Sequence, residues 1–447
     1  MSNVNQFKKS RLVLGLFLGL NSSAVFAAPF GLTEFYQKAL GHDASLAQAK
    51  AQYQADIQAI DTARSALLPQ IQADGSYAIN DSSINSSDVT TQDLSITLNQ
   101  SLYQHSNWAR YEQSKQSSDV ALATLKNAEQ TLILSVAKSY FAVLLAQQSL
   151  VLTQSKQASN RLQYETALAS AELGLLSRVD VLEAKSSFDI AKSETIQAEN
   201  ALDNAQEALA KISGVSAINI QQSGLKVLEL NSQLPELNLN ETELENLAKS
   251  QNLTVKIAQS QTDVASSEIE VQKSGYWPTV ALQAKYSDTR YSDYQTGASF
   301  ADNDRTSIAV SVSMPLYSGG GTNSQVTAAK QKSMAAQQAL RNAQENASLE
   351  VRTQLRNLHR GEKLINALRE AVKSNDAFVE SAQEGYKVGL KSMLEVLTAT
   401  ANQTNAHRTL IEAIHNQVLS HLTLEASIGD LTLADIERYE PLLQAKP

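Results

Sequence analysis

Four segments of the chain alternate apolar and small polar residues with a period of two, and they fall into two pairs. Residues 70–80 and 93–102 form the first pair, and residues 279–287 and 307–316 form the second. Period-two alternation predicts β-strands, so we expect two β-hairpins. Runs of about ten residues have the length of a membrane-spanning strand, and one apolar face opposite one wet face is typical of a barrel around a polar lumen. A soluble sheet with one face on a core gives the same alternation and is the alternative.

Between the hairpins, apolar residues recur at helical spacing over very long stretches. Residues 107–172 and 322–387 each cover 66 positions, which corresponds to about 99 Å of α-helix. No proline interrupts either stretch. Shorter helices are expected at residues 45–66, 179–211, 243–273 and 394–427. Stacked end to end beside the long helices, they would complete a curved wall of helix pairs. A filled four-helix bundle is the alternative, but it would not explain strands placed where the helices end.

One short sequence occurs twice. GLLSRVDVLEAK begins at Gly174 and GLKSMLEVLTAT begins at Gly389, so that six of twelve positions are identical at an offset of 215 residues. The chain is therefore a tandem duplication. Each copy places a glycine between two helical patterns, which predicts a reversal at a tip where one helix ends and the next runs back.

The N-terminus has the pattern of an export signal. Lys8, Lys9 and Arg11 precede an apolar run at residues 12–20, and Val-Phe-Ala at 25–27 resembles a cleavage site. We expect the mature chain to begin at Ala28. The chain has no cysteine, which excludes disulfides, thiolate metal sites and a lipid-bearing N-terminal cysteine. No long apolar run is evident in the mature chain, so a membrane-embedded part would be a closed barrel.

Charge and motif content argue against other classes of protein. The net charge is -9 with dispersed charges, so no basic surface for nucleic acid is expected. Gly319-Gly320-Gly321 lacks the spacing and lysine of a phosphate loop. The six histidines show no metal-ligand spacing, and we find no catalytic constellation and expect no cofactor.

Four strands cannot close a barrel of at least eight, so we expect the barrel to be shared between copies of the chain. The polar segments 81–92 and 288–305 would be its outward loops. The competing class is a periplasmic coiled-coil tether with a soluble sheet and no pore.

These features resemble the TolC family of outer-membrane efflux and secretion channels. The resemblance rests on the following segments: Leu-Leu-Pro at 67–69, Ser-Leu-Tyr at 101–103, Trp-Pro at 277–278, Met-Pro-Leu-Tyr-Ser-Gly-Gly at 314–320, Asn-Ser-Gln-Val at 323–326 and Gly-Tyr-Lys-Val-Gly at 385–389. It implies a mixed α and β membrane protein. A homotrimer would form a 12-stranded outer-membrane β-barrel in contact with lipid, continuous with a periplasmic α-helical barrel of coiled coils. The trimer would act as an exit duct for drugs, toxic small molecules or secreted proteins, together with a periplasmic adaptor and an inner-membrane pump of the RND, ABC or MFS type.

The resemblance also divides the chain. The expected parts are a signal peptide (1–27), a periplasmic helical segment (28–66), the first barrel hairpin (67–104), the first long helical hairpin (105–212), a collar segment (213–242), a second periplasmic helical segment (243–275), the second barrel hairpin (276–318), the second long helical hairpin (319–428) and a C-terminal collar segment (429–447).

Site residues follow from the same resemblance. Asp180, Tyr386 and Lys391 match a periplasmic gate, in which Asp180 would accept a hydrogen bond from Tyr386 and pair with Lys391. Glu395 matches an entrance carboxylate, whereas Thr398 replaces the second one, so a ring of three carboxylates is implied. The implied adaptor-docking tips are Leu173, Gly174, Leu175, Val388, Gly389 and Leu390. Ordinary surface charges on a solvated turn are the alternative for each gate residue.

Overall fold

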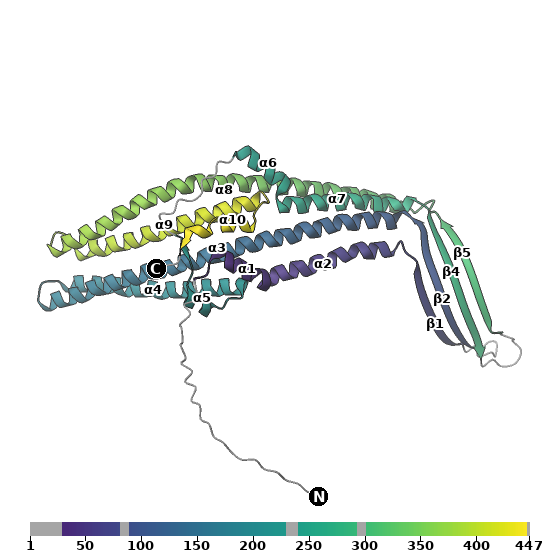
Figure 1. The fold of residues 1–447 in the computed structure, drawn as a ribbon, viewed down its shortest axis with the longest axis horizontal. Helices are drawn as coiled ribbons and strands as arrows, with labels where there is room; N and C mark the ends of the chain where they lie inside the picture. The colour runs from purple at the N-terminus through teal and green to yellow at the C-terminus, as the bar shows by residue number, and fades with distance from the viewer. Residues whose placement is uncertain (1–28, 81–88, 229–239, 293–300, 445–447) are drawn as a thin grey trace, which may run out of the picture.

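The structure, a computed structural model, describes residues 29–80, 89–228, 240–292 and 301–444. The predicted signal peptide and its cleavage site lie outside the described residues. The chain forms an elongated body in which long helices join a sheet at one end and two hairpin tips at the other (Figure 1).

The sheet has four antiparallel strands, which confirms the two predicted hairpins. Its order is β1 (Gln70–Asn80), β2 (Val89–Gln104), β4 (Thr279–Ser292) and β5 (Asn303–Ser313). β2, β4 and β5 extend into the predicted loops 81–92 and 288–305, of which residues 81–88 and 293–300 lie outside the described residues. β5 ends at Ser313, so the predicted continuation to Leu316 is wrong. Pro315 has no N–H to donate to the strand ladder, which explains the end of pairing near this position.

The strand register places apolar residues on one continuous face. Ile71 pairs with Leu98, Leu98 with Ala284 and Ala284 with Ile308, so one row crosses all four strands. The side chains at the two ends of this row are 71% and 74% exposed. Strands β1 and β5 have no strand partner on their outer edges in the described part of the chain. An apolar face this exposed requires another apolar medium, and bare strand edges require partner strands.

The two long helices form the main length of the body. The helices that build the two halves are α2 (Ala44–Ser65), α3 (His105–Glu172) and α4 (Arg178–Ser213) in the first, and α7 (Leu253–Lys273), α8 (Gly321–Lys387) and α9 (Met393–Ser427) in the second. Figure 1 shows α2 and α4 arranged end to end along α3, and α7 and α9 along α8. The lengths predicted for the two long helices, and the stacking of shorter helices beside them, are therefore confirmed. Near the sheet, α3 also packs on α7, so α2, α3, α7 and α8 form one layer.

One predicted helix is divided. Residues 243–273 contain part of α6 (Glu241–Gln251) and all of α7, separated by Asn252, whose φ and ψ angles of -53° and 132° are not helical. The Asn252 carboxamide oxygen accepts hydrogen bonds from the N–H groups of Thr254 and Val255 at 2.9 and 3.2 Å, and its Nδ2 donates to the Ser427 carbonyl at 2.9 Å. Because this side chain caps α7 and ties it to α9, it stabilises a break instead of a continuous helix.

The main core lies where the chain segments meet near the middle of α3. Around this helix lie α1 (Leu32–His42), α5 (Ala217–Ser223), β3 (Val227–Leu228), α10 (Leu433–Glu437), a 3-10 turn (Glu440–Leu442) and β6 (Leu443–Gln444). A second 3-10 turn (Ser274–Tyr276) joins α7 to β4 at the sheet end. The strands β3 and β6 pair with each other. Tyr140 Oη donates to the Lys226 carbonyl at 2.7 Å, and the Lys226 ammonium donates to Glu440 at 2.6 Å. Segments from three distant parts of the chain are thereby joined.

Among the described helices, α3 has a stretch long and apolar enough, by length and composition, to cross a membrane. This differs from the expectation that no such run exists. Val136, Tyr140 and Leu144 of α3 are fully buried in the main core, which accounts for its apolar character without a membrane.

Candidate functional site

The two hairpin tips are built in the same way. Gly174 follows α3 and Gly389 follows α8, with φ angles of 77° and 75°. In this left-handed region a residue with a Cβ is strained, so glycine ends each helix and lets the chain reverse. The repeated glycine thus has a conformational reason in both halves.

A capping box follows each tip. Ser177 Oγ accepts from the Asp180 N–H at 3.2 Å, and the Ser177 N–H donates to Asp180 Oδ2 at 3.1 Å. Ser392 and Glu395 make the same pair of bonds at 3.3 and 2.8 Å. Asp180 and Glu395 therefore occupy equivalent positions and stabilise the starts of α4 and α9. This shared role was not predicted from the sequence, although serine followed three residues later by a carboxylate is present in both repeats.

Lys391 pairs with Glu395 and not with Asp180. Its ammonium lies 2.6 Å from Glu395 Oε1. Hydrogen bonds from Lys391 and from Ser392 lower the pKa of Glu395 to about 2. The side chain and N–H of Ser177 lower the pKa of Asp180. Within one chain, the expected Asp180–Lys391 pair is therefore replaced by a local pair four residues apart on the second tip.

Tyr386 lies between the two hairpins. It packs against a small cluster made of Ala167 of α3, Ala184 of α4, and Met393 and Leu397 of α9. Burial, with a contribution from the charge of Asp180, raises the pKa of Tyr386. No hydrogen bond joins Tyr386 to Asp180 in the part of the chain that the structure describes, so the structure brings the two residues near each other without the expected bond.

The remaining predicted residues lie on the outermost turns. The apolar residues Leu173, Leu175, Val388 and Leu390 are all strongly exposed there, at 69 to 81%. Thr398 Oγ1 donates to the Leu394 carbonyl at 2.8 Å and carries no charge. The tips therefore present apolar side chains and a small set of charges, arranged at the end of the body farthest from the sheet (Figure 1).

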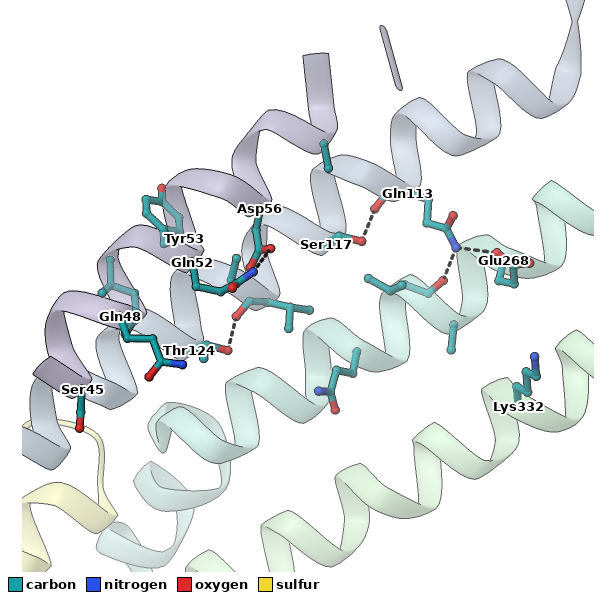
Figure 2. Close-up of a pocket in the computed structure, with 18 residues that line it drawn as sticks. Ser45, Gln48, Gln52, Tyr53, Asp56, Gln113, Ser117, Thr124, Glu268 and Lys332 are labelled. Atoms are coloured by element: carbon teal, nitrogen blue, oxygen red, sulfur yellow. Dashed lines mark hydrogen bonds between the residues drawn. The ribbon is translucent and has the colours of Figure 1, made fainter. Parts of the chain in front are cut away.

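A concave region lies on the helical layer on the side toward the sheet. This hollow has a volume of about 770 Å³ and is lined by residues of α2, α3 and α7, with Lys332 of α8 at one side (Figure 2). Two carboxylates at its rim are held by amides, because Gln52 donates to Asp56 at 2.7 Å and Gln113 donates to Glu268 at 2.8 Å. Since residues of all four helices of the layer line this hollow, the layer curves around it. The sequence pattern did not predict it, because these polar residues read only as helix surface.

In the described residues, no three His, Cys, Asp or Glu side chains are placed to hold a metal ion. His407 lies 2.9 Å from Asp376, whereas His415 and His421 are buried in the wall beside the main core.

An exposed apolar sheet with bare edges, continuous with helical hairpins about 100 Å long, defines the subunit of an outer-membrane channel. The family model described as "Outer membrane efflux protein" matches residues 35–215 and 244–430. The chain is 32% identical over 427 residues to outer membrane protein TolC of Vibrio cholerae serotype O1, covering 95% of this chain and 96% of that protein. It is 25% identical over 457 residues to the proteases secretion protein PrtF of Dickeya chrysanthemi, covering 98% and 96%.

The fold is similar to the crystal structure of the Campylobacter jejuni CmeC outer membrane channel, with a TM-score of 0.77 at 16% identity over 92% of this chain and 90% of that one. The chain therefore belongs to the outer membrane efflux protein family. It is an outer-membrane protein that serves as an exit duct for efflux and type I secretion, and the alternative of a soluble tether is set aside.

Proposed function

We propose that three copies of the chain close into one duct, in which three four-stranded sheets form a 12-stranded barrel in the outer membrane. The observation that carries this proposal is the open sheet: within the described residues, β1 and β5 each have an outer edge without a strand partner, while the apolar face is exposed. Joining β5 of one copy to β1 of the next satisfies both edges and turns every apolar face to lipid. The helical layers then continue the wall through the periplasm.

The segments around residues 213–242 and 429–447 would form a collar about the middle of this tube. Their support is the pairing of β3 with β6 and the bond between Lys226 and Glu440, which hold both segments against α3. On this view the collar keeps the helix pairs together at the level where α2 gives way to α4 and α7 gives way to α9.

The tips act as the gate. Asp180, Tyr386 and Lys391 hold the closed state through contacts between hairpins, and opening exchanges those contacts for the local Lys391–Glu395 pair seen within the chain. An exposed ion pair contributes only about 0 to 1 kcal/mol. Interactions this weak suit a gate that opens when a partner binds.

The entrance carries one ring of carboxylates, made of Glu395 from each copy. Since Thr398 is uncharged, the ring has three carboxylates instead of six. We expect weaker block by trivalent cations than in a homologue with two such rings, which can be measured as the concentration that halves single-channel conductance. Block as tight as in that homologue contradicts the single ring.

The exposed apolar tips dock on a periplasmic adaptor. The proposed contact residues are Leu173, Gly174, Leu175, Val388, Gly389 and Leu390. Through the adaptor the duct serves an inner-membrane pump of the RND, ABC or MFS type and passes drugs, toxic small molecules or secreted proteins. The names of the relatives, which include a protein of protease secretion, support both kinds of cargo.

Reconstitution of the purified protein in planar bilayers tests this function. We expect heat-modifiable trimers in the outer-membrane fraction and discrete conductance steps. Replacing Tyr386→Phe together with Lys391→Ser should raise the conductance of each step, because both changes remove contacts between hairpins. Absence of steps from a trimeric wild-type preparation contradicts the duct. An unchanged conductance in the double variant contradicts only the gate.

A further inference from the structure

The two tips differ in charge at several corresponding positions, and one of these is the residue before the capping serine. The residue before the capping serine is Lys391 in the second tip and Leu176 in the first. The backbone is equivalent at the glycine and at the cap, since Gly174 and Gly389 have similar φ angles and each serine caps the next helix. The turn therefore does not require a lysine at this position, because the first tip forms the same turn with Leu176.

Both oxygens of Glu395 are occupied. Oε1 receives the Lys391 ammonium at 2.6 Å, whereas Oε2 receives the Ser392 N–H at 2.8 Å and the Ser392 hydroxyl at 3.1 Å. The side chains of Lys391 and Glu395 are exposed to similar degrees, 41% and 44%, so solvent reaches both charges equally. The ion pair of Lys391 and Glu395 therefore has no net charge.

The neighbouring charges do not undo this balance. One turn earlier on α8, Lys387 pairs with Glu384 at 2.6 Å. Across the hairpins, Asp180 is bonded to Ser177 and takes part in no ion pair among the described residues. In the second tip, Glu384 and Glu395 each form an ion pair with a lysine, whereas Asp180 of the first tip forms none among the described residues.

We propose that Lys391 determines the charge selectivity of the entrance by neutralising Glu395 in each copy. The inference rests on the proposed duct and changes what its ring does: three masked carboxylates neither attract cations nor repel anions strongly. The duct then admits anionic and cationic solutes to similar degrees, and the carboxylate ring becomes effective only when Lys391 is removed or moved.

Reversal potentials in a KCl gradient test this proposal on the full-length trimer in bilayers of neutral lipid. Lys391→Gln unmasks Glu395 and should raise the cation-to-anion permeability ratio by about threefold, because three unit charges act within roughly one Debye length of the entering ion. Glu395→Gln unmasks Lys391 and should lower the ratio by a similar factor. Glutamine can still bond the Ser392 N–H, so the capping box survives.

Three further variants sharpen the test. The double variant Lys391→Gln with Glu395→Gln should return the ratio to the wild-type value, and Lys391→Arg should also retain it because the positive charge remains. Arg341→Gln is the matched control. Arg341 pairs with Glu345 at the same i,i+4 spacing on α8, at 2.9 Å, about 69 Å from the end of the helix. Its replacement should leave the ratio unchanged.

The possible results distinguish a failure of charge masking by Lys391 from a failure of the proposed duct. If Lys391→Gln has no effect while Glu395→Gln abolishes an existing cation preference, Glu395 is not masked and the proposal is overturned. A change in Arg341→Gln as large as in Lys391→Gln also overturns it, since the effect is then not local to the tip. If the wild-type trimer gives no conductance steps, it is the duct that fails.

Discussion

Acidification should destabilise the wall of the tube through two buried histidines of α9. His415 and His421 are 4% and 2% exposed. Burial lowers the pKa of His415 from 6.5 to about 4, and burial together with the charge of Arg438 lowers the pKa of His421 to about 4. The groups around His421 are Tyr439, which is bonded to its Nδ1, Glu425 at 3.6 Å from its Nε2, and Asp435. Both imidazoles are therefore neutral in the folded protein at neutral pH.

The sign and size of the effect follow from proton linkage. A histidine whose pKa is lower in the folded state binds its proton more readily when unfolded, so its stability contribution is complete above pH 6.5 and is lost as the pH falls toward 4. At pH 5 the loss is about 2 kcal/mol for each ring and about 4 kcal/mol for both. For a chain of 447 residues this lowers the melting temperature by about 4 °C.

Thermal unfolding of the trimer, followed by circular dichroism at about pH 7.5 and about pH 5, measures this loss. The double variant His415→Leu with His421→Asn has no buried imidazole, while asparagine keeps a partner for Tyr439. Its melting temperature should fall less between the two pH values than that of the wild type. His359→Gln, at an exposed position, controls for the loss of a histidine. A double variant that shows the full wild-type loss refutes the reasoning.

Three more substitutions test the contacts that shape the wall. Gly429→Ala should lower the free energy of unfolding, measured by denaturant titration, by about 2 kcal/mol or more. The reason is that φ is +78° and a Cβ would lie 2.2 Å from the Gln251 carbonyl oxygen. A variant as stable as the wild type would contradict this close approach. Tyr140→Phe should lower the free energy of unfolding by about 1 to 3 kcal/mol in the same assay, because the Lys226 carbonyl loses the hydroxyl that donates to it. An unchanged free energy of unfolding would mean that water takes the place of the hydroxyl. Ser177→Ala should cost about 1 kcal/mol locally, seen as faster amide exchange at the start of α4 but not at the start of α9.

The local patterns of the sequence determined most of the secondary structure. Alternation located the four strands, and long stretches without proline located α3 and α8 almost to their ends. The repeated glycines located both tips, because a left-handed turn admits few other residues. These features depend on residues close together in the chain, which is why they can be read without the fold.

Contacts between distant segments decided the rest. Asn252 ends a helix because its side chain reaches Ser427 as well as its own neighbours. The histidines of α9 are neutral because other segments bury them, and nothing in their spacing indicates this. At the tips, the repeat identified the residues but not their bonds. The ammonium of Lys391 lies 2.6 Å from Glu395, whose side chain is held in place by its hydrogen bond from the Ser392 N–H. Short-range geometry determines which elements form, whereas burial and the partner of each charge depend on how those elements pack.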